Sequence, residues 1–197
     1  MKPLLRYMAE CQKEANRRVL SHCEKESSVP FVKVPIFFRT IHATVCHIAV
    51  VNELWLHRIQ GSSHAHLNYL YDDATPKEAW GTIFPTMQDA SRALLQSDLR
   101  VQEALEATPE EQLNDLSEPL RAKKKSKKAT KLRPSIISFR TTEGVDKEQY
   151  KAVAYLHIFN HATHHRGQIH AAFTTLGKEG PVLDIPDFNI KGGCCYY

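Results

Sequence analysis

Histidines are concentrated in one stretch of the sequence, residues 155–170, which holds five of the chain's eleven histidines. No proline interrupts this stretch, and apolar residues at helical spacing continue on both sides, so we expect one helix from about Lys147 to Leu176. On a helix, residues four apart lie about 40° apart around the axis and about 6 Å apart along it. His161 and His165 therefore share a face, an arrangement by which a helix offers two imidazoles to one metal ion.

The other histidines of this stretch cannot complete such a site by themselves. His157 extends the same face, but about 12 Å of helix rise separates it from His165, so one straight helix cannot bring both onto one ion together with His161. His164 is rotated about 60° from His161 in the other direction. A third ligand must come from elsewhere in the chain. Histidines on a helix also serve as polar surface or as hydrogen-bonded core residues, and this structural role is the alternative.

Length and composition indicate an ordinary globular protein. We expect the 197 residues to form one domain, residues 1–197, with 42% apolar and 24% charged residues. Much of the net charge of +4 comes from one segment, because eight of the thirteen residues 121–133 are Lys or Arg. This run has little to bury, so we expect a basic, solvated loop there. An irregular tail is expected over about 178–197.

Cysteine usage and the N-terminal sequence indicate a reducing compartment. The five cysteines are odd in number and have no CxxC spacing. The first residues are too poor in apolar side chains for a signal peptide, and no stretch approaches the length of a transmembrane helix. We expect a cytoplasmic location, free thiols and no membrane partner. Cys194 and Cys195, near the C-terminus, are interpreted as tail residues.

Helical periodicity predicts the elements that must position the histidines. Apolar residues recur at spacings of three and four in four segments, about 4–24, 36–59, 83–107 and 147–176. A short extra turn is expected from Thr108, and residues 135–142 have the β-branched and aromatic composition of a short strand. Four long helices with short intervening pieces predict an all-α four-helix bundle, with this irregular or strand segment before the last helix.

The missing ligand is expected on the second helix. Residues 36–59 are dense in apolar side chains, yet His42 and His47 lie among them. Buried polar side chains need partners, and bundles commonly hold metals between facing helices. If the second and fourth helices face each other, either histidine completes the site, and periodicity does not choose between them.

Three segments of the sequence together resemble a known family. Residues 160–168 read Asn-His-Ala-Thr-His-His-Arg-Gly-Gln, residues 176–184 follow with Leu-Gly-Lys-Glu-Gly-Pro-Val-Leu-Asp, and residues 44–61 carry a further histidine segment. They resemble the DinB family of damage-inducible bacterial proteins. The resemblance implies a bundle in which a long crossover joins the second and third helices. The basic run at 121–133 and the tail at 189–197 depart from the family pattern.

The resemblance also implies a site. It predicts one divalent transition metal ion held by three histidines, which map onto His47, His161 and His165. We expect zinc or nickel, although iron and copper also suit imidazole. The neighbours expected to hydrogen-bond these ligands are His157, Asn160 and Gln168.

Three neutral imidazoles leave coordination positions open, which is typical of catalytic sites. The family resemblance adds that the wider superfamily includes thiol-dependent transferases and some hydrolases. From the three histidines and this resemblance together, we expect a metal-dependent enzyme that activates a small-molecule thiol or water, of the thiol transferase or hydrolase type. The alternative is a metal-binding, stress-related protein without catalysis. Nucleic-acid contact through the Lys-rich loop is less favoured, because the run lacks interleaved aromatic residues and a reading helix.

The roles of other residues and the oligomeric state are inferred less directly from the sequence. No catalytic side chain is identified. Arg166 is interpreted as a structural residue, and Gly167 is expected to permit close helix packing. The family resemblance implies a homodimer.

Overall fold

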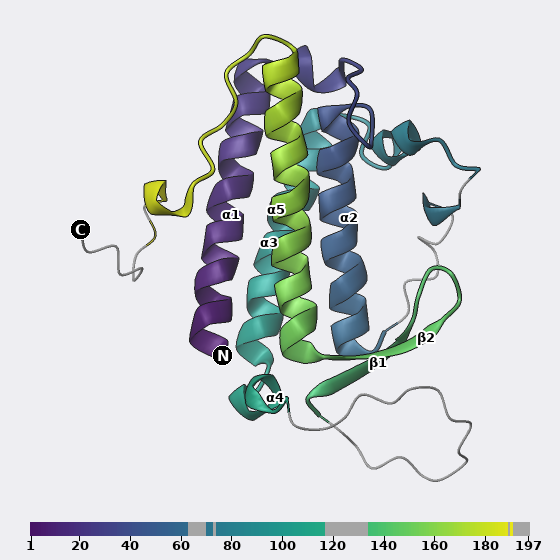
Figure 1. Cartoon of the computed structure of the whole chain (residues 1–197), viewed down its shortest axis with the longest axis vertical. Coiled ribbons are helices and arrows are strands. Elements are labelled where there is room, and N and C mark those ends of the chain that lie inside the picture. The colour runs from purple at the N-terminus through teal and green to yellow at the C-terminus, as the bar shows by residue number, and fades with distance from the viewer. Residues whose placement is uncertain (63–69, 73, 117–133, 189, 191–197) are drawn as a thin grey trace.

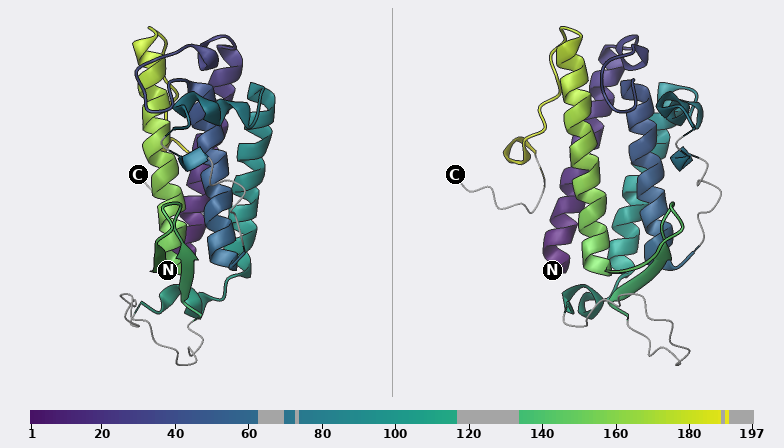
Figure 2. Two further views of the ribbon diagram at one scale, coloured as in Figure 1. Left: turned by 90° about the vertical axis from the view of Figure 1, so that its right-hand side faces the viewer. Right: turned by 45° about the vertical axis from the view of Figure 1, so that its right-hand side comes forward.

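Four long helices form the body of the protein. The computed structural model describes residues 1–62, 70–72, 74–116, 134–188 and 190. The helices are α1 (Lys2–Lys25), α2 (Ile41–Gln60), α3 (Met87–Ala107) and α5 (Lys151–Thr175), and they lie side by side along the long axis of the molecule (Figures 1 and 2). The prediction of an all-α four-helix bundle is confirmed.

The direction of each helix explains the connections. Lys2, at the start of α1, donates to the backbone oxygen of Glu106, at the end of α3, so these helices are antiparallel. His42, at the start of α2, contacts the backbone oxygen of Phe84, just before α3, so α2 and α3 are parallel. The end of α2 and the start of α3 therefore lie at opposite ends of the bundle, so the connection between them is the expected long crossover.

Threonine caps set the starts of two helices later than periodicity predicted. The Thr40 hydroxyl accepts a hydrogen bond from the Ala43 amide at 3.0 Å, and that of Thr86 from the Asp89 amide at 3.1 Å. Each satisfies an amide that has no partner within the helix. The expected starts at 36 and 83 were wrong because apolar spacing continues ahead of the caps.

A hairpin precedes the last helix. Strand β1 (Ile136–Arg140) pairs antiparallel with β2 (Asp146–Tyr150), with Ile136 opposite Tyr150. The expected strand is confirmed, but the expected helix start at 147 was wrong because residues 146–150 pair with β1. The expected extra turn is the short helix α4 (Glu110–Asn114). Helix α4 and the hairpin therefore cover this end of the bundle (Figure 1).

Two expectations fall outside the described residues. They are the basic loop at 121–133 and the tail cysteines at 194–195. The tail is described at residues 178–188 and 190, and this part is irregular except for one 3-10 turn, η4 (Ile185–Asp187). Among the described helices, none has the length and apolar character needed to cross a membrane.

A buried polar network ties the four long helices together, since Asn52 on α2 also donates to Asp98 on α3, at 3.4 Å. The two carboxylate oxygens of Asp98 on α3 accept from the amides of Gln12 and Asn16 on α1, each at 2.8 Å. Asn16 in turn accepts from Arg166 on α5 at 3.0 Å. Burial raises the pKa of Asp98 to about 6 and lowers that of Arg166 to about 10. Arg166 therefore serves the structural role expected of it.

Replacing Asp98 should destabilise the bundle strongly. In Asp98→Ala, the buried Arg166 guanidinium loses its compensating charge, and the amides of Gln12, Asn16 and Asn52 each lose an acceptor. We expect the free energy of unfolding in urea to fall by about 3 kcal/mol. Glu103→Ala on the exposed side of α3 should change it by less than about 0.5 kcal/mol. Equal effects of the two substitutions would show that the network contributes little.

Candidate metal centre

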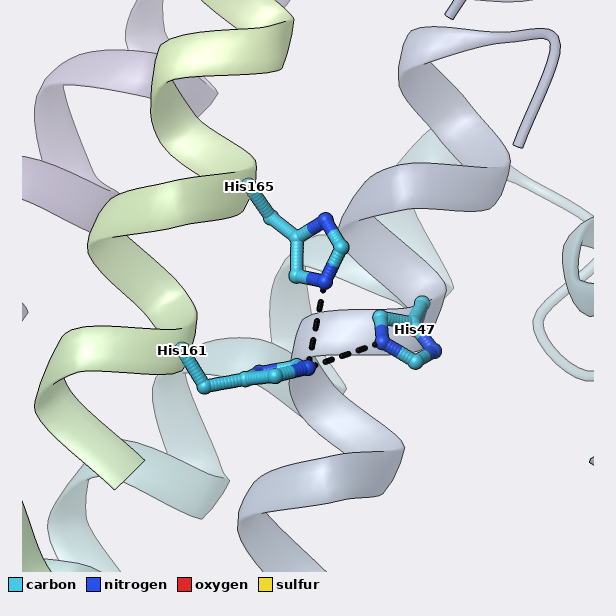
Figure 3. Close-up of side chains that lie close together, drawn as sticks. All are labelled: His47, His161 and His165. Atoms are coloured by element: carbon cyan, nitrogen blue, oxygen red, sulfur yellow. Dashed lines mark hydrogen bonds between the residues drawn. The ribbon is translucent and has the colours of Figure 1, made fainter. Parts of the chain in front are cut away.

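Three imidazoles meet between α2 and α5. His47 projects from α2, while His161 and His165 project from successive turns of α5 (Figure 3). The His161 Nε2 atom lies 3.0 Å from that of His47 and 3.1 Å from that of His165. All three ligand atoms lie within 4.8 Å of one another. The structure thus brings together the three histidines that the family resemblance implied.

This convergence cannot be satisfied by hydrogen bonds alone. A neutral imidazole nitrogen carries either one proton or one lone pair. The single His161 Nε2 atom faces two other nitrogens at hydrogen-bond distance, so it can serve only one of them well. A cation placed among three lone pairs would satisfy all of them together.

Gln168 sets the tautomer of one imidazole. Its side-chain oxygen lies 2.9 Å from His165 Nδ1, so this nitrogen carries the proton and donates it. The lone pair of His165 is then on Nε2, which faces the centre of the cluster. The amide nitrogen of Gln168 donates to His164 Nε2 at 3.1 Å, so the same side chain contacts two histidines. Gln168 therefore takes the position expected of a residue that orients a ligand.

Burial keeps the cluster neutral. Loss of solvent lowers the pKa of His161 to about 3 and that of His165 to about 4, and it lowers the pKa of His47 well below its usual range. The neighbouring histidines lower the pKa of His47 and His161 further. Neutral imidazole is the form that binds metal, so no proton competes at pH 7.

Aromatic rings cover the His47 side of the cluster. The ring centroid of Phe38 is 4.1 Å from that of His47, and the centroid of Trp80 is 4.4 Å from it. Trp80 belongs to a 3-10 helix, η3 (Lys77–Thr82), within the crossover. Sequence reasoning missed both residues. Trp80 is a large apolar residue in a polar segment, and this isolation is the signal that could have singled it out.

Other candidate residues lie outside the cluster. His42, the alternative to His47, instead bonds the backbone oxygen of Phe84 at 2.8 Å. His157 stacks against Trp55, with its ring centroid 5.8 Å from that of His161. Asn160 is exposed and, among the described residues, makes no hydrogen bond to the three histidines. A Cβ atom added at Gly167 would meet nothing within 4 Å, so the expectation that Gly167 permits close helix packing was wrong.

The donor set fits a divalent transition metal. Imidazole nitrogens bind zinc at about 2.0–2.1 Å, so two of them in a tetrahedral site are about 3.3 Å apart. The two separations that involve His161, 3.0 and 3.1 Å, are close to this value, and the His47 and His165 ligand atoms lie within 4.8 Å of each other. His47, His161 and His165 can therefore hold one metal ion after a small adjustment of their side chains.

Acidification should destabilise the metal-free protein, because these imidazoles take up protons when the chain unfolds. His161 and His165 have folded-state pKa values below their usual 6.5, so the unfolded chain binds protons first as the pH falls. Their contribution is present above pH 6.5 and is lost as the pH falls towards 4. We expect protonation of the two imidazoles to lower the free energy of unfolding by about 4 kcal/mol between pH 7 and pH 5, about 2 kcal/mol for each.

The matched comparison is the double variant His161→Asn/His165→Asn, unfolded in urea at both pH values. Asp98 acts in the opposite direction, because burial raises its pKa, but it does so equally in both proteins. The difference between them therefore isolates the histidines. The same pH dependence in both would contradict their buried, neutral state.

Comparisons with known proteins bear on the family to which the chain belongs. A comparison with curated proteins gives no match. A comparison with protein-family models matches the DinB family over residues 4–191. Because the match spans nearly the whole chain, the protein belongs to the DinB family.

Proposed function

We propose that this protein is a divalent-metal-dependent enzyme that activates a low-molecular-weight thiol or water. The observation that carries the proposal is the set of three convergent, neutral imidazoles. Among the described residues, no fourth Cys, His, Asp or Glu belongs to this group. Structural zinc sites use four protein ligands, whereas catalytic ones use three and leave a position for substrate.

The chain's own residues would hold and orient the centre. The three Nε2 atoms of His47, His161 and His165 would bind the ion, and Gln168 would keep the His165 lone pair directed at it. Phe38 and Trp80 would exclude water from the side of His47. A reacting group must then approach from a side that these rings leave free.

The bound ion would supply Lewis acidity, which lowers the pKa of a coordinated thiol or water into the neutral range. A thiol would make the protein a transferase, and water would make it a hydrolase. Zinc and nickel are the ions that we propose, and iron and copper are compatible with the same ligands. The expected homodimer and cytoplasmic location stay predictions.

A second candidate is metal binding without catalysis. In the described part of the chain, no carboxylate hydrogen-bonds to the three histidines, and the Nδ1 atoms of His47 and His161 are buried without a partner. Turnover usually needs a group that accepts or donates a proton near the reacting atom. Retention of metal without turnover of any thiol or ester substrate would favour this candidate.

Metal content tests the centre directly. The protein should be purified without a metal-affinity tag and analysed for transition metals by mass spectrometry. We expect about one equivalent in the wild type and less than about a tenth of that in His165→Ala, because two imidazoles hold a metal weakly. The control is His170→Ala, which removes an exposed histidine of the same helix that does not contact the cluster or Gln168. Absence of metal from the wild type, even after reconstitution, would contradict the proposal.

Turnover separates the two candidates. Metal-loaded protein is tested for transfer of small thiols to an electrophilic aromatic chloride and for ester hydrolysis. Chelation should abolish the activity, and the metal should restore it. Activity that survives metal removal would show that the chemistry takes place elsewhere.

Replacing Gln168 should lower the affinity for metal and leave the fold unchanged. Gln168→Ala removes the acceptor that fixes the His165 tautomer, so we expect metal affinity to fall by about 10–100-fold. Competition with a chelating dye measures this change, and circular dichroism checks the helix content. An unchanged affinity would show that packing alone orients His165.

A further inference from the structure

Arg58 on α2 is a buried arginine whose guanidinium has no hydrogen-bond acceptor. It is 7% exposed, and it makes no hydrogen bond or ion pair with any described residue. Its Nε atom is buried without a partner. The terminal nitrogens, Nη1 and Nη2, have no partner either, but they are not fully buried. A ligand can therefore reach the terminal nitrogens, although it cannot reach Nε.

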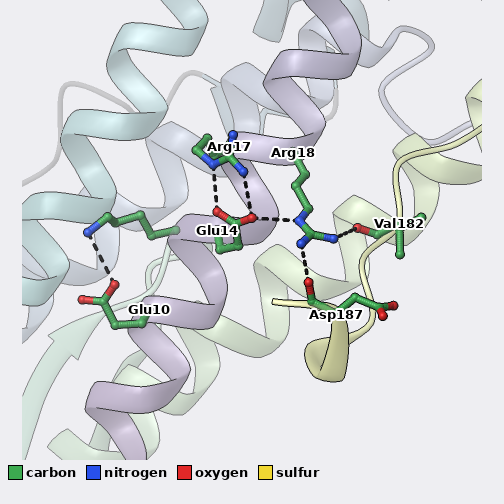
Figure 4. A network of polar contacts seen from close by, with 7 residues as sticks. Glu10, Glu14, Arg17, Arg18, Val182 and Asp187 are labelled. Carbon is green, nitrogen blue, oxygen red and sulfur yellow. Dashed lines mark hydrogen bonds and ion pairs between the residues drawn. The ribbon is translucent and has the colours of Figure 1, made fainter. Parts of the chain in front are cut away.

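Other arginines of the bundle do have acceptors. Arg17 and Arg18 each donate to Glu14 at 2.8 Å, and Arg18 also donates to two backbone oxygens of the C-terminal segment (Figure 4). Arg166, the other buried arginine of the described residues, donates to Asn16 at 3.0 Å. A buried charge without a partner opposes folding, and in natural proteins such departures are concentrated at functional sites.

Aromatic rings hold the Arg58 guanidinium in place. Its Cζ atom lies 4.7 Å from the ring centroid of Trp55 on α2 and 4.5 Å from that of Phe139 on β1. Such contacts stabilise the positive charge, but they supply no anion to compensate it. Because Trp55 lies about one turn before Arg58, the side chain leans towards the start of α2, and therefore towards the level of His47.

The guanidinium lies on the same face of α2 as the metal ligand of that helix. Arg58 follows His47 by eleven residues, which places the two within about 20° around the axis and about 16 Å along it. On the facing helix, the His157 ring centroid lies 4.5 Å from that of Trp55 and 5.8 Å from that of His161. His157 is exposed, so solvent reaches this side of the cluster, whereas aromatic rings cover the side of His47.

The charged and titratable neighbours leave the guanidinium uncompensated. Burial lowers the pKa of Arg58, while Tyr71 and Glu143 raise it, and a guanidinium stays charged at pH 7. Glu143 is exposed in the hairpin turn and forms no ion pair with Arg58. Burial raises the pKa of Tyr71 to about 12, so its hydroxyl is neutral. Burial, and Arg58 itself, lower the pKa of His157, so this imidazole is neutral as well.

We propose that Arg58 binds a carboxylate of the substrate whose thiol reaches the metal centre. A carboxylate has two oxygens, which match the fork of N–H groups at the end of a guanidinium. The inference rests on the proposed function, and it narrows the substrate to a thiol that carries a carboxylate at a set distance from its sulfur.

The spacing of the two groups sets the shortest thiol that fits. Because the Arg58 side chain leans back by about one turn, its guanidinium lies about 11 Å below the level of His47. A thiolate sulfur binds about 2.3 Å from a metal ion, and a paired carboxylate carbon lies about 4 Å from Cζ. The sulfur and the carboxylate carbon must therefore be at least about 5 Å apart, which 6-mercaptohexanoate spans and mercaptoacetate does not.

The first test uses the metal-free protein, so that it does not depend on the metal centre. Hexanoate is titrated while the indole N–H signal of Trp55, which is assigned with Trp80→Phe, is followed by nuclear magnetic resonance. We expect a saturable shift with hexanoate and at least about tenfold weaker binding of hexan-1-ol. No saturable shift with hexanoate, or equal binding of the alcohol, would overturn the proposal.

Variants of Arg58 test the location. Arg58→Met keeps the length of the side chain without its charge and should abolish hexanoate binding. Arg58→Lys keeps the charge without the fork and should weaken binding by at least about fivefold. The control is Arg92→Met, which removes an exposed arginine of α3 and should leave binding unchanged. If Arg58→Met does not fold, as judged by circular dichroism, Arg58→Lys decides. Unchanged affinity in the folded Arg58 variants would overturn the location.

The second test uses the cobalt-loaded protein, in which charge-transfer absorption reports the binding of a thiolate. We expect 6-mercaptohexanoate to bind at least about tenfold more tightly than 6-mercaptohexan-1-ol in the wild type, and less than about twofold more tightly in Arg58→Met. Mercaptoacetate should have no such advantage over 2-mercaptoethanol. Equal binding of the two six-carbon thiols in the wild type would overturn the proposal.

The two tests separate the two possible failures. Loss of the hexanoate response alone would overturn the Arg58 site and leave the proposed function of the metal centre standing. Binding of hexanoate at Arg58, together with no binding of any thiol to the loaded protein, would overturn the thiol function and with it this assignment of the substrate.

Discussion

The close approach of α2 and α5 at one level of the bundle is the constraint on which the candidate centre depends. Both helices must place an imidazole at the same height, and His161 Nε2 then faces two other nitrogens at about 3 Å. Solvent is excluded, so these groups stay neutral, and their lone pairs have no complete set of donors within the described protein. The rest of the fold maintains this arrangement. The caps set where α2 begins, and the Asp98 network holds α5 against α1 and α3.

Sequence periodicity predicted the features that follow from local spacing. The pairing of His161 with His165 needs only helical geometry, and the bundle needs only four amphipathic segments. The choice of His47 over His42 came from the family resemblance, because both lie in an apolar helix and only the register across the bundle separates them. Strand β2 was missed because its pairing with β1 is a tertiary contact. Phe38 and Trp80 were missed because loop residues have no periodicity from which their direction can be read.

Helix α5 presents different chemistry on its two sides. One side carries the imidazoles, and the other carries Arg166. His165 and Arg166 are adjacent in sequence, yet one belongs to the metal cluster and the other to the buried charge network. A single turn of helix therefore links a metal-binding group to a charge that stabilises the bundle. A shift of α5 along its axis would alter both together.

The parallel arrangement of α2 and α3 also has a consequence for folding. At least 15 residues separate each long helix from the next, and the contact between His47 and His161 spans 114 residues. Contacts so distant in sequence are slow to form, because a long loop must close before they stabilise the chain. During synthesis, His47 leaves the ribosome long before its partners on α5. The metal-binding cluster is therefore assembled late, after the first three helices have already been made.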